Sequence, residues 1–376
     1  MNIIRKNLFH KRINTARCIS FGFALIILVG ALLLMLPISS KERVVTPFLS
    51  ALFTTTSATC VTGLTLINVG AYFSLFGQAV ILFLIQLGGL GFMTILCIVF
   101  IVSNRQIGLR NRMLIAQTMG TESLEGIVKL AKHVLYITGI IELLGAIVLS
   151  IRFVPKYGFF KGMWFSIFHS VSAFCNAGFD ILGTKDHTFV SLTGYMGDPL
   201  INIVIMLLII VGGIGFVTWD DIYINKWKIK RYRMQSKVIL TTTVWLILLP
   251  AIFFFFQDFS ELPMGKRLLM SVFQSVTPRT AGFNTADLAA MTEPSKAIMI
   301  LLMLIGGSPG STAGGMKTTT FAVLVLNAFA TFRSQENVET FGRRIEYSVI
   351  KNASTIAMMY CMLFLCGGIT ISVYEG

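Results

Sequence analysis

Long apolar stretches, separated by short polar segments, recur along the whole chain of 376 residues. A helix needs about 18–20 apolar residues to cross a bilayer, and six stretches reach that length. They cover residues 18–38, 75–103, 130–151, 200–219, 238–257 and 352–372. A seventh stretch, residues 296–330, is apolar at both ends but interrupted at its centre. The pattern predicts an all-α polytopic membrane protein.

Three other apolar runs, residues 46–57, 160–173 and 263–276, are much shorter. Runs of this length are typical of re-entrant or buried helices, because a helix so short cannot cross the bilayer. Each run leads into a segment with a glycine near its end. The segments read SATCVTGL at 57–64, SAFCNAGF at 172–179 and VTPRTAGF at 276–283. We therefore expect three short helices, each followed by a glycine loop.

A pair of adjacent glycines follows each of these loops further along the chain. It occurs in QLGGLGF at 86–92, IVGGIGF at 210–216 and LIGGSPG at 304–310. Two signatures in the same order predict an internal repeat made of a span, a short helix, a glycine loop and a second span. The predicted copies are residues 18–103, 127–225 and 235–331, the last with a broken second span.

Each predicted copy crosses the membrane twice, so every copy starts on the same side. This arrangement favours parallel repeats around a central pore over the inverted repeats of many transporters. Residues 350–376 read as the first span of a fourth copy, without a short helix or glycine loop after it. We expect the fourth copy to belong to a longer chain; a natural chain of three and a half copies is the alternative.

The distribution of charge predicts which side of the membrane each loop faces. Residues 1–17, 103–132, 220–237 and 331–351 carry 20 of the 31 basic residues but only seven of the 17 acidic ones. These segments lie between alternate spans, so the positive-inside rule assigns them, and with them the N-terminal residues 1–17, to the cytoplasm. The basic residues show no base-reading module, so we expect contact with lipid headgroups and no binding of nucleic acid.

The glycine loops are candidates for cation binding. Non-helical backbone is tolerated at membrane depth only where it lines water or is buried in protein. A short helix that enters from outside points the negative end of its dipole at the pore, and the carbonyls after it can replace the hydration shell of a cation. The candidate ion-binding residues are Val61, Thr62, Gly63, Asn176, Ala177, Gly178, Thr280, Ala281 and Gly282. The alternative is that the glycines only permit tight turns between spans.

These motifs resemble the Trk/Ktr/HKT superfamily of cation transporters, and most closely the bacterial Ktr membrane subunit, which forms the pore. The residues that carry the resemblance are TCVTGL at 59–64, CNAGF at 175–179, TPRTAGF at 277–283 and GGSPGSTAGG at 306–315. The resemblance implies four repeats around one pore, and it implies potassium as the substrate because the first loop has glycine at Gly63 where sodium-selective relatives have serine.

The resemblance also implies how the protein is assembled. We expect a multi-pass protein of the bacterial plasma membrane, in which a homodimer of pore subunits sits on a cytosolic nucleotide-binding ring. The nucleotide would bind the ring, so no cofactor is expected on this chain. Basic residues between Lys226 and Lys237, together with Arg343 and Arg344, are candidates for docking the ring.

The interruption of the seventh apolar stretch is a candidate gate. Glycine costs a helix about 1 kcal/mol and proline about 3 kcal/mol relative to alanine, so a continuous helix is not expected here. The gate residues are Gly306, Gly307, Ser308, Pro309, Gly310, Ser311, Thr312, Ala313, Gly314 and Gly315, together with Lys317. Lys317 would repel a permeating ion or pair with a carboxylate. A static kink is the alternative to a gate.

Five isolated polar residues at membrane depth or at its edge have simpler roles. We expect Glu142 to pair with a polar group, and Arg279 to point away from the pore and brace its loop. Asp180 would concentrate cations at the mouth, Asp198 would do the same or cap the following helix, and His169 would be a hydrogen-bonded core residue.

Other functions explain less of the sequence. A sodium-permeable or sodium-coupled transporter is the alternative within transport, since carbonyl loops select ions by geometry and field strength rather than by side-chain identity. A polytopic membrane enzyme would need reactive groups gathered at membrane depth, whereas the spans offer mostly isolated charges. An enzyme, a scaffold or a receptor would also leave the register of the glycine loops without a purpose, so we expect no enzymatic activity.

Overall fold

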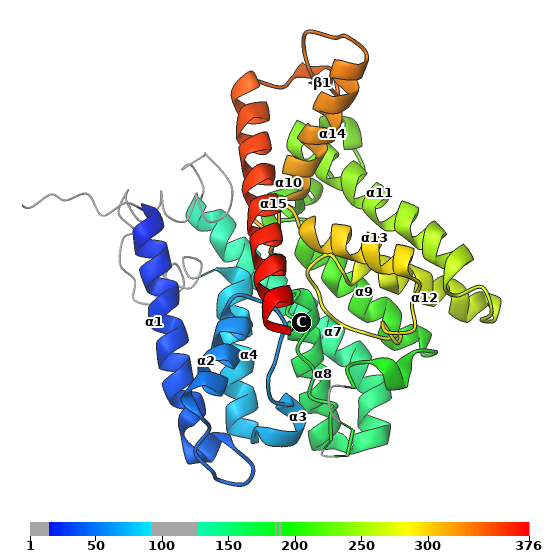
Figure 1. Cartoon of the computed structure of the whole chain (residues 1–376). Helices are drawn as coiled ribbons and strands as arrows, with labels where there is room; N and C mark the ends of the chain where they lie inside the picture. The colour runs from blue at the N-terminus through cyan, green and yellow to red at the C-terminus, as the bar shows by residue number, and fades with distance from the viewer. Residues whose placement is uncertain (1–14, 92–126, 185, 188–189, 376) are drawn as a thin grey trace, which may run out of the picture.

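The structure is a computed structural model that describes residues 15–91, 127–184, 186–187 and 190–375. Helices form almost all of it (Figure 1). The longer helices are α1 (Thr15–Met35), α4 (Leu75–Leu90), α7 (Ile127–Tyr157), α9 (Pro199–Gly213), α11 (Met234–Gln257), α14 (Thr318–Phe332) and α15 (Tyr347–Glu375). The shorter ones are α2 (Phe48–Thr59), α3 (Val69–Tyr72), α8 (Phe159–Phe174), α10 (Phe216–Asn225), α12 (Met264–Val276) and α13 (Glu293–Leu304).

Three 3-10 turns and one hairpin complete the described elements. The turns are η2 (Pro37–Ser39), η3 (Thr193–Tyr195) and η4 (Ile229–Arg231). The hairpin pairs β1 (Glu339–Thr340) with β2 (Arg343–Arg344), with Thr340 opposite Arg343. Phe341 and Gly342 both have positive φ, which is the backbone of a tight two-residue turn. The expectation of a purely α-helical chain misses this hairpin.

Several helices of the described chain are long and apolar enough to span a membrane. Residues Val128–Tyr157, helix α11 and residues Tyr347–Tyr374 each reach the necessary length and hydropathy, and α9 with α10 would make a fourth, bent span. Helices α1, α4 and α14 are shorter apolar helices. Large apolar side chains are exposed on their outer surfaces, for example Phe21 on α1 and Leu143 on α7. Lipid, rather than water, is the solvent that suits such a surface.

The predicted span at residues 200–219 is wrong as a continuous helix. Helix α9 ends at Gly213, and α10 leaves it at an angle of 96°. Gly215 at the break has a φ of 92°, which residues with a side chain rarely adopt. The N–H of Phe216 donates to the carbonyl of Gly310, 2.7 Å away, instead of continuing the helical ladder. The break therefore depends on a contact with a distant segment.

The three short helices occur where the sequence predicts them. Helices α2, α8 and α12 begin and end within about two residues of the predicted apolar runs. Helix α8 packs on both α7 and α9, and α2 lies between α1 and α4 (Figure 1). Fully buried phenylalanines, including Phe168, Phe174 and Phe273, fix these short helices inside the bundle.

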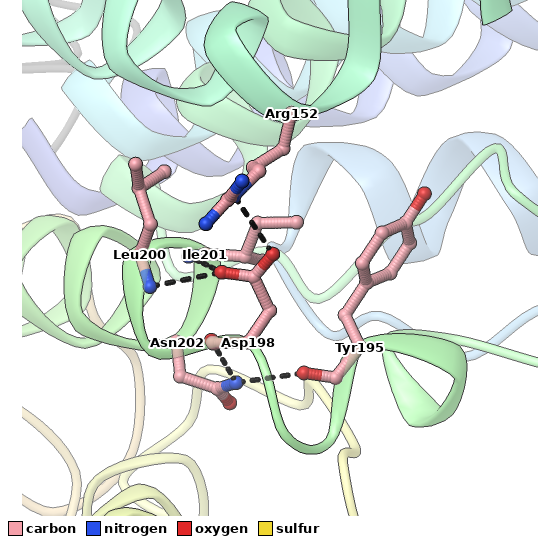
Figure 2. A network of polar contacts seen from close by, with 6 residues as sticks. All are labelled: Arg152, Tyr195, Asp198, Leu200, Ile201 and Asn202. Atoms are coloured by element: carbon pink, nitrogen blue, oxygen red, sulfur yellow. Dashed lines mark hydrogen bonds and ion pairs between the residues drawn. The ribbon is translucent and has the colours of Figure 1, made fainter. Parts of the chain in front are cut away.

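Asp198 fixes the start of α9. Its Oδ1 accepts hydrogen bonds from the N–H groups of Leu200 and Ile201, at 3.0 and 3.4 Å, and its Oδ2 lies 3.0 Å from Nε of Arg152 on α7 (Figure 2). The amide of Asn202 donates to the carbonyls of Asp198 and Tyr195. Of its two predicted roles, the structure supports capping, and the ion pair ties α9 to the end of α7.

Replacing Asp198 by alanine is expected to lower the free energy of unfolding by about 1–2 kcal/mol, because two N–H groups lose their acceptor. Asp198→Asn keeps a capping oxygen and loses only the ion pair, which is half exposed at Arg152 and worth about 0–1 kcal/mol. Thermal unfolding in detergent measures both. Equal destabilisation by the two variants would contradict the capping role.

Candidate functional site

The three glycine loops share one unusual backbone conformation. Each has two residues with positive φ, separated by one residue. The pairs are Val61 (57°) and Gly63 (80°), Asn176 (56°) and Gly178 (66°), and Thr280 (64°) and Gly282 (81°). A positive φ is energetically unfavourable for any residue that has a side chain, so it is rare outside glycine. Its recurrence in the same register three times indicates a common structural demand on the loops.

The loops also converge in space. A Cβ atom built on Gly63 would lie 2.5 Å from the carbonyl oxygen of Ala177, and one on Gly178 would lie 2.4 Å from that of Ala281. A Cβ on Gly282 would lie 3.5 Å from Cα of Gly178. The glycine of one loop thus abuts the backbone of the next, and no side chain fits between them. The structure brings together all three predicted glycines.

Side chains and backbone of the short helices hold each loop. The N–H of Thr62 donates to the carbonyl of Ser57 at 2.8 Å, and that of Ala177 donates to Ser172 over the same distance. The hydroxyl of Ser172 donates to the carbonyl of Phe179 at 2.8 Å. In the third loop the hydroxyl of Thr277 donates to the carbonyl of Phe283 at 2.5 Å. The last turn of each short helix therefore sets the path of its loop.

The side chain of Asn176 faces the scaffold. It is almost fully buried, and with its amide nitrogen turned toward them it donates to the carbonyls of Ala173 and Ile209, each 3.2 Å away. Ala177 and Ala281 are buried as well. An ion at these three predicted positions would therefore contact the backbone rather than the side chain.

The paired glycines at 88–89 and 212–213 allow helices α4 and α9 to approach the carbonyl ends of the short helices α2 and α8. A Cβ on Gly88 would lie 2.1 Å from the carbonyl oxygen of Thr59, and one on Gly212 would lie 2.0 Å from that of Phe174. A Cβ on Gly89 would lie 2.7 Å from Sγ of Cys175. The sequence marks these glycines by their recurrence, but gives no reason for them. Their reason is close backbone packing directly behind the loops.

The predicted gate is a hydrogen-bonded loop between α13 and α14, whose ends meet in a parallel bridge between Ile305 and Met316. We call this loop, residues 306–315, the hairpin from here on; it is distinct from the β1–β2 turn. The ends of the hairpin pair through the N–H of Gly306 and the carbonyl of Met316, at 2.9 Å, and through the N–H of Thr318 and the carbonyl of Gly307, at 3.0 Å. The hydroxyls of Ser308 and Thr318 lie 2.9 Å apart. The segment is therefore an ordered loop with its own contacts, rather than a simple kink in a helix.

The same hairpin closes the end of α9. The N–H of Ser308 donates to the carbonyl of Gly213 at 2.9 Å, and that of Thr312 donates to Gly212 at 3.2 Å. The hydroxyl of Thr312 donates to the carbonyl of Phe174, the last residue of α8, at 2.9 Å. The hairpin thus lies directly behind the second glycine loop and satisfies carbonyls that the helix ends leave free.

Lys317 binds within the hairpin. Its Nζ donates to the carbonyl of Ala313 at 2.8 Å, so in the described structure its partner is a backbone carbonyl rather than a carboxylate.

Residues 306–310 match the Gly-x-Ser-x-Gly spacing of serine hydrolases. Ser308 is fully buried, and among the described residues its hydroxyl is paired with Thr318 rather than with a histidine.

The other isolated polar residues differ in how well they are paired. Gln86 donates to Oε2 of Glu142 at 3.1 Å, and Asp180 accepts from the N–H of Leu182. His169 is fully buried, with Nδ1 2.7 Å from the carbonyl of Phe165. Arg279 is 6% exposed, and its Nε has no hydrogen-bond partner among the described residues.

The fold and these loops define a helical membrane transport protein. The sequence matches the family described as TrkH, cation transport protein, over residues 20–375, and the chain belongs to that family. This result confirms the resemblance to the Trk/Ktr group. It also confirms that the chain is not an enzyme.

Several curated proteins are similar to most of the chain. The potassium/sodium uptake protein NtpJ of Enterococcus hirae is 38% identical over 380 residues, which covers 100% of this chain and 82% of that protein. The Ktr system potassium uptake protein B of Bacillus subtilis is 38% identical over 370 residues, covering 97% of this chain and 81% of that protein. The crystal structure of the potassium transporter TrkH from Vibrio parahaemolyticus has a similar fold, with a TM-score of 0.72 at 19% identity, covering 96% of this chain and 72% of that one.

Gly212→Ala is expected to destabilise the protein by about 1–3 kcal/mol, because the new methyl group would overlap the carbonyl of Phe174. Gly139→Ala is the matched control, since a Cβ there meets nothing within 4 Å in the described structure. The control is expected to be neutral or to gain about 0.5–1 kcal/mol from reduced chain entropy. Thermal unfolding in detergent distinguishes them; similar effects of both would show that close packing is not what the glycine provides.

Proposed function

We propose that the protein takes up potassium ions across the bacterial plasma membrane through a filter of backbone carbonyls. The filter residues are Val61, Thr62, Gly63, Asn176, Ala177, Gly178, Thr280, Ala281 and Gly282. The observation that carries the proposal is the shared positive-φ register of three loops whose glycines abut one another. Three tight turns between spans would have no need to meet or to repeat one conformation.

The proposed filter selects ions by its carbonyl geometry. Carbonyl oxygens replace the hydration shell, and the C-terminal ends of α2, α8 and α12 add partial negative charge. The names of the similar proteins, potassium/sodium uptake protein and Ktr system potassium uptake protein, support potassium as the substrate. Since the first of these names includes sodium, a sodium-permeable or sodium-coupled transporter is the second candidate.

We propose that the loops belong to parallel repeats around one pore. The proposed repeats are residues 18–103, 127–225 and 235–331, with a fourth beginning at residue 350. The order of long helix, short helix, loop and helix in α1–α2–α4, α7–α8–α9 and α11–α12–α13 supports them. The positive charge of alternate loops supports a cytoplasmic N-terminus.

Residues 306–315 and Lys317 are the proposed gate. The hairpin is fastened to α9 and α8 by three hydrogen bonds, one from Ser308 and two from Thr312. Each such bond has a modest net free energy, so a limited set of contacts separates the closed position from a displaced one. Lys317, held on Ala313, would move its charge together with the hairpin.

The proposed assembly is a homodimer on a cytosolic nucleotide-binding ring, with lipid around the spans. The name of the similar Bacillus subtilis protein assigns it to a Ktr system, which supports a partner for this chain as well. The basic segment from Lys226 to Lys237 carries Trp227, which is 95% exposed, and is the proposed docking surface. Nucleotide would bind the ring, and this chain would carry no cofactor.

Uptake of rubidium and sodium into proteoliposomes tests the filter. Gly178→Ala is expected to reduce rubidium uptake by about tenfold or more, because alanine strains the left-handed backbone and its methyl group overlaps the carbonyl of Ala281. Gly194→Ala, at a glycine with open space around it, is the control with unchanged uptake. Unchanged uptake in Gly178→Ala, or sodium uptake that exceeds rubidium uptake in the native protein, would contradict the potassium filter.

Loosening the hairpin tests the gate. Thr312→Val removes the hydroxyl bonded to Phe174 and is expected to raise rubidium uptake about threefold, since the closed position loses one hydrogen bond. Deletion of residues 308–313 is expected to raise it further. Thr331→Val removes an exposed hydroxyl on α14 and serves as the control. Uptake that stays at the native rate after the deletion would exclude a gate.

A further inference from the structure

Three polar side chains connect helices α4 and α7 to the start of the second glycine loop. Gln86 on α4 donates from Nε2 to Oε2 of Glu142 on α7, at 3.1 Å. Its own Oε1 accepts from Sγ of Cys175, at 3.6 Å, a normal distance for a thiol donor. Cys175 is fully buried and directly precedes Asn176. We call Gln86, Glu142 and Cys175 the polar bridge.

A second contact reinforces the bridge at the same level. The hydroxyl of Ser170 on α8 donates to the backbone carbonyl of Glu142 at 2.6 Å. Gly145, one turn further along α7, packs its backbone against Oγ of Ser170, since a Cβ there would lie only 2.4 Å away. Helix α7 is therefore held closely against α8 where the carboxyl group of Glu142 extends toward α4.

The corresponding positions in the other two units have no such bridge. Counting back from the paired glycines, Gln86 corresponds to Ile210 and Leu304. Counting back three residues from the loop glycines, Cys175 corresponds to Cys60 and Arg279.

The position of Glu142 is occupied by isoleucine in each of the other two units. The long helices can be aligned on the pairs Gly30–Ala31, Gly145–Ala146 and Pro250–Ala251. Three residues before these pairs lie Ile27, Glu142 and Ile247, respectively. The contacts agree with this alignment, because Gly30 faces Thr55 of α2 and Leu84 of α4, as Gly145 faces Ser170 of α8 and Leu208 of α9.

Packing alone therefore does not require a carboxyl group at position 142. Two equivalent sites are filled by isoleucine, and an ionisable side chain inside a membrane is costly. Oε1 of Glu142 has no hydrogen-bond partner among the described residues, which adds to that cost. A carboxyl group that is energetically unfavourable, and that is present at only one of three equivalent sites, points to a role in function.

We propose that the polar bridge positions the second glycine loop and thereby sets ion selectivity, with Glu142 as a positioning residue; this inference rests on the proposed filter. Glu142 holds the amide of Gln86 in the orientation that presents Oε1 to Cys175. The thiol then fixes the first residue of the loop against α4. Without the carboxyl group the amide of Gln86 can turn over, its NH₂ group faces the thiol, and Asn176 to Gly178 lose a point of attachment.

The ratio of rubidium to sodium uptake by the full-length protein in proteoliposomes tests the bridge. Glu142→Ile, which installs the residue of the equivalent sites, is expected to lower the ratio by about three- to tenfold, the effect of one lost hydrogen bond. Glu142→Gln keeps an oxygen that accepts from Gln86 and is expected to stay within about twofold of the native ratio. Gln86→Leu is expected to match Glu142→Ile.

Thr138→Val is the matched control. Thr138 is buried on α7, one turn before Glu142, and its hydroxyl has no partner among the described residues. The control is expected to leave the ratio unchanged. If Glu142→Ile folds as well as the control and keeps the native ratio, the bridge has no role in selectivity.

A further variant and the uptake by the native protein separate failure of the polar bridge from failure of the proposed function. If Glu142→Ile does not fold, Cys175→Ala removes the thiol at the end of the bridge, and a native ratio in that variant overturns the proposal. Native protein that transports neither ion would refute the proposed function itself. Native protein that prefers rubidium, with variants that share this preference, would refute the polar bridge alone.

Discussion

Backbone carbonyls at membrane depth need partners, and this requirement governs the arrangement around the glycine loops. Where α2, α8 and α12 end, no water in the hydrocarbon region can satisfy them. The structure meets the demand at the end of α8 with the hydroxyl of Thr312, which donates to the carbonyl of Phe174. At the neighbouring end of α9, N–H groups of the hairpin at 306–315 donate to the carbonyls of Gly212 and Gly213. In the proposed filter, carbonyls of the loops themselves are the groups that meet an ion.

The need to pair backbone carbonyls also determines how the hairpin behind the second loop is held. It bonds to Gly212, Gly213 and Phe174, which are the last residues of α9 and α8. A displaced hairpin leaves these carbonyls unpaired unless water or an ion replaces it. In the proposed gate, the free-energy cost of opening therefore depends on whether water can reach these carbonyls.

Much of this arrangement can be predicted from the sequence, because length and register carry it. Apolar runs of a dozen residues predict α2, α8 and α12, and the three glycines in register predict loops that meet. The break after Gly213 cannot be predicted in the same way, since the stretch from 200 to 219 contains no charged residue or proline and the break depends on Gly310. The pairing of Gln86 with Glu142 is equally hidden, because it joins residues 56 positions apart on separate helices.

The bond from Phe216 to Gly310 has a mechanical consequence. Phe216 is the first residue of α10, and α10 leads through Asp221, which accepts from the N–H of Arg233, to the start of α11. Helix α10 therefore connects the hairpin to the start of α11, with one hydrogen bond at each end. In the proposed gate, a displacement of the segment between α10 and α11 would reach the hairpin through α10, without any group entering the glycine loops.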